Sequence, residues 1–162
     1  MATYGCSVEW TRGDAAFSDL QYSRAHDWRF DGGAVVRGSS SPHSVRVPFS
    51  DPGAVDPEEA LVAAVSSCHM LWFLSLAAEE GYVIDSYSDS ARASMGRFPD
   101  GRRGLTEIVL RPLVVVWGGR TPDDAALDAL HHAAHARCDI GNSVRGEVRV
   151  QGSWRMAGDE AS

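Results

Sequence analysis

The stretch DPEEALVAAVSSCHMLWFLSLAAEEG, residues 56–81, decides the fold. Asp56 can cap a helix, Pro57 suits the first helical position, and the two glutamates that follow lie where the helix dipole favours negative charge. At the other end, Gly81 offers a left-handed stop. The pattern therefore predicts one long helix from Asp56 to about Glu80.

This predicted helix is apolar on nearly every side, which is typical of a helix that is buried on all faces. It is about as long as a membrane span, but serines and a histidine interrupt it and much of the rest is alanine. We therefore expect a soluble protein in which this helix is the spine of the core or of a dimer interface. Its large apolar residues are Leu61, Val62, Val65, Met70, Leu71, Trp72, Phe73, Leu74 and Leu76.

Segments typical of β-strands lie on both sides of the helix. Those before it are residues 4–11, 20–30, 34–37 and 44–49. After it, residues 83–95 and 105–117 predict a hairpin of long strands around turn residues 99–101, residues 123–138 predict a second capped helix, and residues 144–155 predict a last strand. Because strands and helices do not alternate regularly, the order predicts an α+β fold.

Composition and charge narrow the class of protein. The 162 residues, of which 44% are hydrophobic, predict a single domain over residues 1–162. The net charge is −7, and all fifteen basic residues are arginines spread along the chain, so we expect no nucleic-acid partner. No basic segment leads into an apolar run at residues 1–10, so we expect a cytoplasmic protein with neither a membrane anchor nor structural disulfides.

The three cysteines Cys6, Cys68 and Cys138 show no CxxC spacing. The ordinary interpretation of a cytosolic cysteine is a small buried hydrophobe. A thiol becomes reactive toward peroxides only where a positive charge or a donor stabilises its thiolate, so Cys68 in mid-helix needs help from elsewhere. Arg24, in the predicted strand 20–30, is a candidate for that help, whereas nothing around Cys6 suggests a catalytic role.

The residues around Cys68 and Cys138 resemble the motifs of a known family. Residues 56–68, DPEEALVAAVSSC, look like the central-helix signature of the OsmC/Ohr family, and residues 134–138, AHARC, resemble its second cysteine motif. Residues 22–26, 30–33, 68–70 and 142–143 are similar to one branch of that family. The resemblance covers residues 22–150 and implies an OsmC-like fold in an intertwined homodimer.

The resemblance also implies an activity, with no cofactor and no metal. In peroxidase members the first cysteine attacks an organic hydroperoxide, the second closes a disulfide with it, and an arginine paired with a glutamate activates the first. By resemblance these roles fall on Cys68, Cys138, Arg24 and Glu58, and an external dithiol reduces the disulfide. The sequence departs from the peroxidase pattern at Asp139, where proline usually follows the second cysteine.

Each member of the activating pair has alternatives. Arg29, Arg37 and Arg46 lie close enough in sequence to compete with Arg24. Glu59 competes with Glu58, and both could simply compensate the helix dipole.

The spacing between Glu58 and Cys68 limits how the pair could work. The two residues lie ten positions apart, which is ~15 Å along one helix, so they cannot touch within it. Either Arg24 bridges them or the glutamate comes from a second subunit.

Two other functions remain open. The chain could be a non-catalytic or weakly catalytic stress or ligand-binding protein that keeps the fold and the cysteines. It could also bind zinc or copper, since His131, His135 and Cys138 recur at helical spacings of four and three and His69 could join them. For the peroxidase, an apolar wall of Met70, Trp72 and Phe73 would suit alkyl or aryl hydroperoxides.

Overall fold

The structure, a computed structural model, describes residues 1–159 and has the predicted α+β composition. The chain divides into two compact units, Met1–Ala60 and Leu61 onward. The single domain over 1–162 stays a prediction.

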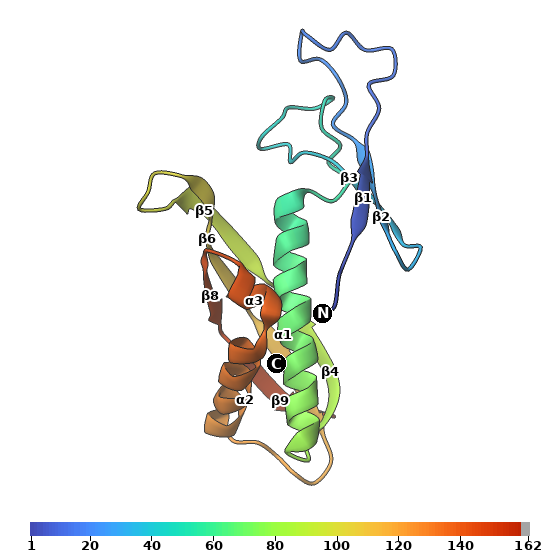
Figure 1. Cartoon of the computed structure of the whole chain (residues 1–162). Coiled ribbons are helices and arrows are strands. Elements are labelled where there is room, and N and C mark those ends of the chain that lie inside the picture. The colour runs from blue at the N-terminus through green and yellow to red at the C-terminus, as the bar shows by residue number, and fades with distance from the viewer. Residues whose placement is uncertain (160–162) are drawn as a thin grey trace. The chain divides into compact units, whose positions relative to one another are not determined.

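The first unit contains a three-stranded antiparallel sheet in the order β1-β2-β3 (Figure 1). Its strands are β1 (Cys6–Glu9), β2 (His26–Phe30) and β3 (Val35–Gly38). Gly33, with φ of 87°, makes the turn between β2 and β3 in a backbone conformation that favours glycine.

Two strand predictions in this unit were wrong. The strand expected over 20–30 begins only at His26, and Leu20 has a positive φ of 62°, which is incompatible with a strand. Residues 44–49 form turns, in which the amides of Ser44 and Val45 both donate to the carbonyl of Ser41. Arg24 therefore precedes β2 and does not lie in it.

The central helix α1 (Pro57–Glu79) has the predicted bounds. A capping box starts it: the Glu59 amide donates to Asp56 Oδ1 at 2.8 Å, and the Asp56 amide donates to Glu59 Oε2 at 3.2 Å. At the far end, Gly81 adopts the expected left-handed conformation, with φ of 78°.

Burial of α1 on all faces was a wrong expectation for the single chain. By length and composition α1 could cross a membrane, but one of its faces lies in the core of the second unit. The other side is more open, and Leu71 is 61% exposed. The helices and sheets of the second unit cover one face only, which consists of Val65, His69, Phe73, Leu76 and Ala77.

The predicted hairpin is present, but each of its long strands is divided, so two sheets form in place of one ribbon. One sheet has the order β4-β7-β9 and the other β5-β6-β8; in each, the first pair is antiparallel and the second is parallel. The strands are β4 (Val83–Asp89), β5 (Arg92–Arg97), β6 (Arg103–Leu110), β7 (Pro112–Trp117), β8 (Glu147–Val150) and β9 (Ser153–Met156).

The Asp89 side chain forms hydrogen bonds at the point where the two long strands are divided. One carboxylate oxygen accepts from the amide of Arg111, between β6 and β7, at 2.7 Å, and the other accepts from Ser66 Oγ of α1 at 2.5 Å. Pro112 follows Arg111 and has no amide to donate to a continuing ladder. The break in both strands is therefore tied to the central helix.

The second predicted helix is α2 (Asp124–Arg137), and Asp123 caps it by accepting from the Ala126 amide at 2.7 Å. A short helix that we did not predict, α3 (Asp139–Ser143), follows at once. Figure 1 shows α2 beside α1, and their apolar side chains share one core with β7. That core contains Phe73, Leu76, Ala77, Val114, Val116, Leu127, Leu130 and Ala134.

Candidate active site

The two cysteines of interest meet where α2 ends against α1. Cys138 lies between α2 and α3, is 1% exposed, and its thiol donates to the Val65 carbonyl at 3.9 Å. The Cys68 side chain lies close enough to Cys138 to contribute to the raised pKa of the Cys138 thiol. The structure therefore brings together two thiols that lie seventy residues apart in the sequence.

The surroundings of the two thiols differ. Burial, reinforced by the neighbouring Cys68 side chain, raises the pKa of Cys138 to about 11, although the Gly141 amide opposes this by donating to its sulfur at 3.2 Å. Cys138 is therefore a protonated thiol at neutral pH. Cys68 is half-buried and both are free thiols, whereas Cys6 is exposed on β1 of the other unit. Of the two paired sulfurs, Cys68 is the one open to a small molecule.

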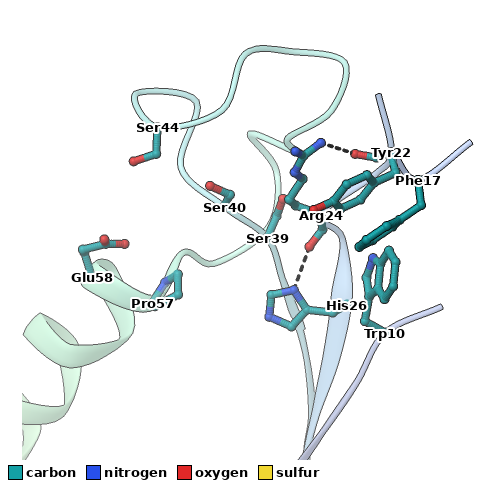
Figure 2. Close-up of a pocket in the computed structure, with 10 residues that line it drawn as sticks. All are labelled: Trp10, Phe17, Tyr22, Arg24, His26, Ser39, Ser40, Ser44, Pro57 and Glu58. Atoms are coloured by element: carbon teal, nitrogen blue, oxygen red, sulfur yellow. Dashed lines mark hydrogen bonds between the residues drawn. The ribbon is translucent and has the colours of Figure 1, made fainter. Parts of the chain in front are cut away.

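Arg24 and Glu58 line a pocket of about 600 Å³ in the first unit (Figure 2). Three aromatic rings gather on one side of it, and Glu58 lies on the other side, beyond Pro57. The Phe17 and Tyr22 rings stack at 4.7 Å between centroids, and Trp10 meets Tyr22 edge-on at 5.4 Å. The remaining lining residues are His26, Ser39, Ser40 and Ser44.

Local contacts hold the Arg24 side chain in place. Its Nη1 donates to the carbonyls of Leu20, at 2.7 Å, and Tyr22, at 2.5 Å, and its guanidinium carbon lies 3.9 Å from the centre of the Tyr22 ring. These contacts use one guanidinium nitrogen and one face of the group. The other nitrogens keep donors for a ligand in the pocket.

The competing arginines have other surroundings. Arg29 forms an ion pair with Glu9, and Arg37 forms one with Asp27. Arg46 is exposed and lies near the Phe49 ring. None of the three lines the pocket that contains Arg24.

The two candidate glutamates, Glu58 and Glu59, also have different surroundings. Glu59 is occupied by the capping box, whereas Glu58 is half-buried and lines the pocket. Within residues 1–159 no ion pair joins Glu58 to Arg24. The two charges thus share a pocket without contact.

Sequence reasoning missed a buried pair of histidines next to the thiols. His69 Nε2 and His131 Nδ1 share a hydrogen bond of 3.0 Å, and the rings are 1% and 4% exposed. A signal existed, because His69 lies between Val65 and Phe73 on an otherwise apolar helix face, where a histidine needs a buried partner. His131 also stacks on Phe73 at 4.4 Å.

The metal-binding alternative gains no support. Across the described residues no group of three or more His, Cys, Asp or Glu side chains is placed to hold a metal ion. His131 instead shares a hydrogen bond with His69, and the Cys138 thiol donates to the Val65 carbonyl.

The proposed apolar wall on α1 was partly wrong. Phe73 is 0% exposed and lies in the core between His131 and Tyr87, so it cannot contact a ligand. Trp72 packs against the same core and lies beneath the Arg137 guanidinium. In the pocket of the first unit, the aromatic wall consists of Trp10, Phe17 and Tyr22, none of which lies on α1.

Comparison with known proteins places this geometry in a family. The model of the OsmC-like protein family matches residues 50–152. The structure of an OsmC-like protein of unknown function from Vibrio cholerae is 49% identical in sequence, has a TM-score of 0.92, and covers 94% of this chain and 100% of its own. No curated protein matches this chain.

More distant structures show the same fold. An organic hydroperoxide resistance protein from Elizabethkingia anophelis has a TM-score of 0.67 at 19% identity, over 97% of this chain and 98% of its own. Another organic hydroperoxide resistance protein, from Bacillus subtilis, has a TM-score of 0.61 at 18% identity, over 95% of this chain and 98% of its own.

Proposed function

Since this chain belongs to the OsmC-like protein family, we propose that it is a thiol peroxidase that reduces organic hydroperoxides. The observation that carries the proposal is the proximity of a half-buried Cys68 to a fully buried Cys138. Distant members of the same fold are named organic hydroperoxide resistance proteins, which agrees with a peroxide-related stress role.

Two thiols are sufficient to reduce one hydroperoxide to an alcohol and water. The Cys68 thiolate attacks the O–O bond of the hydroperoxide, takes one oxygen to become a sulfenic acid, and releases an alkoxide that is protonated to the alcohol. The Cys138 thiol then condenses with the sulfenic acid, which forms the disulfide and releases water. An external dithiol, itself oxidised to a disulfide, returns both cysteines to thiols.

Arg24 and Glu58 supply the polar part of the substrate site in this proposal. The free guanidinium donors of Arg24 would hold the peroxide oxygens and the negative charge that develops on the leaving oxygen. The Glu58 carboxylate can accept the hydroperoxide O–H. The three aromatic rings of the same pocket suit the organic part of the substrate and disfavour hydrogen peroxide.

The proposal is tested by the mass of the fully reduced chain before and after one equivalent of an organic hydroperoxide or of hydrogen peroxide. We expect the organic hydroperoxide to remove two hydrogens rapidly, mapped by peptides to a Cys68–Cys138 disulfide, and hydrogen peroxide to act more slowly. If both thiols stay reduced, or only Cys6 oxidises, the peroxidase proposal fails.

A second test concerns Arg24. Arg24→Gln should slow the oxidation of Cys68 by an organic hydroperoxide about 10- to 100-fold, because the oriented positive charge is lost. Stopped-flow measurement of the second-order rate constant checks this, with the exposed Arg46→Gln as the matched control. Equal rates in the two variants would remove Arg24 from the site.

The partners and the cellular location are part of the same proposal. We propose an intertwined homodimer in the cytoplasm, reduced by a cellular dithiol. The exposed apolar residues of α1, Leu61 at 37% and Leu71 at 61%, support a partner surface there. A dimer would also allow Glu58 of one chain to serve Cys68 of the other.

A ligand-binding stress protein is the second candidate, and the aromatic pocket of the first unit favours it. In that case the pocket binds an apolar ligand and the thiols turn over slowly or not at all. The mass experiment separates the two candidates. Binding of a non-reactive aryl alcohol, followed by tryptophan fluorescence, together with inert thiols would support the binding protein.

A further inference from the structure

The buried histidine pair and the thiol pair are neighbouring contacts across the same two helices. His69 directly follows Cys68 on α1, and His131 of α2 lies seven residues before Cys138, the residue that caps the end of α2. Cys138 and His131 both face α1 and are both buried. Any movement of α1 against α2 that alters one contact therefore alters the other.

The histidine contact restricts that movement more than apolar packing does. A hydrogen bond fixes both a distance and an angle, whereas the surrounding leucine, alanine and phenylalanine contacts tolerate sliding and rotation. Within the described residues, this is the only hydrogen bond between side chains of α1 and α2. The His131 ring is further held by its stack on Phe73.

The pair also has space made for it. A side chain at Gly152, in the link between β8 and β9, would place its Cβ 2.5 Å from His131 Nε2, so glycine leaves the room that the ring occupies. Two ring nitrogens, His69 Nδ1 and His131 Nε2, have no partner among the described residues. Such a pair is a poor source of stability compared with apolar side chains of equal size, which indicates a role in fixing one arrangement.

From this geometry we propose that His69 and His131 are positioning residues for the thiol pair: their hydrogen bond sets the rotation of α1 against α2 that places Cys138 on Cys68. A disulfide forms only within narrow limits of distance and dihedral angle, so a small rotation is sufficient to hinder it. The charged and titratable groups that bear on the pair are Asp89 of β4 and His135 of α2. This role rests on the proposed peroxidase function, but the Cys68–Cys138 disulfide equilibrium that it affects can be measured without peroxide.

The test uses the redox equilibrium of Cys68 and Cys138 against glutathione in a Cys6→Ser parent. Each protein disulfide formed converts one glutathione disulfide into two glutathione thiols, and the oxidised fraction is read by alkylation and mass. The His69→Leu/His131→Phe double variant replaces both partners by apolar side chains of similar size and should stay folded. We expect its disulfide equilibrium constant to be about tenfold lower than the parent's, which is about 30 mV in potential.

A matched control separates positioning from general stability. Leu127→Ala opens a cavity in the same helix interface but leaves the histidine pair intact, so it should lower the melting temperature and leave the disulfide equilibrium constant unchanged. A second variant, Gly152→Ala, displaces the His131 ring and should lower the constant as the double variant does.

The outcomes are distinct. An unchanged constant in the double variant, or an equal fall in Leu127→Ala, overturns the positioning role. A parent that forms no disulfide in glutathione overturns this inference and the peroxidase proposal together. A parent that forms the disulfide normally but is inert toward hydroperoxides overturns only the peroxidase, and the positioning result then decides alone.

Discussion

Cys68→Ser is expected to lower the rate of organic hydroperoxide consumption by at least about 10³-fold, because a serine hydroxyl is not ionised at neutral pH and attacks a peroxide poorly. The rate is measured with an external dithiol as reductant. The matched control is Cys6→Ser, since Cys6 is exposed and lies in the other unit. A fall of similar size in both variants would show that the loss does not come from the proposed nucleophile.

Cys138→Ser should behave differently from Cys68→Ser. It keeps the nucleophile but removes the thiol that condenses with the sulfenic acid. One equivalent of hydroperoxide should therefore add one oxygen to Cys68, and a reagent specific for sulfenic acids should trap it. If this variant instead stays unoxidised, the assignment of Cys68 and Cys138 to the first and second steps is wrong.

Acid should destabilise the second unit through the buried histidines. Burial is the main cause that lowers the pKa of both His69 and His131 to about 4, from 6.5 in the unfolded chain. Below pH 6.5 the unfolded chain therefore takes up protons that the folded chain excludes, and stability falls as the pH falls toward 4. Each depressed pKa contributes up to about 3 kcal/mol to this loss.

Urea unfolding, followed by tryptophan fluorescence, measures the free energy of unfolding as a function of pH. A range from about pH 7.5 to about pH 4.5 covers roughly the titration of a histidine in the unfolded chain. The His69→Leu/His131→Phe double variant should lose markedly less stability over this range than the parent. His132→Gln changes an exposed neighbour and should keep the parent's slope. If the double variant and the parent have the same slope, the acid sensitivity has another source.

The sequence predicted those elements whose ends are set by local side chains. Asp56 and Gly81 bound α1 as expected, and Asp123 caps α2, because each acts on backbone groups a few residues away. The hairpin turn at residues 99–101 was predicted for the same reason. Local rules did not foresee α3, where the Cys138 sulfur itself accepts from the Gly141 amide as the helix cap.

The features that the sequence did not predict depend on contacts between residues far apart in the chain. The sequence pattern around Asp89 is that of one continuous strand, but the structure ends the strand there. The Asp89 side chain bonds to Arg111 and Ser66, which lie more than twenty residues away in either direction, so no local pattern reveals the break. The contact of His69 with His131 spans sixty-two residues and has no motif. The proximity of Cys68 to Cys138 was expected only from family resemblance, because no spacing rule relates two such distant cysteines.

The parallel pairs β6–β8 and β7–β9 have a consequence for how the second unit is made. Leu113 pairs with Ser153, forty residues later, and α2 and α3 lie between them. During synthesis the β6 and β7 edges therefore remain open until residues 147–156 leave the ribosome, and long-range pairing of this kind forms slowly. In this interval an open edge can pair with another chain, and β7 is the more apolar of the two edges.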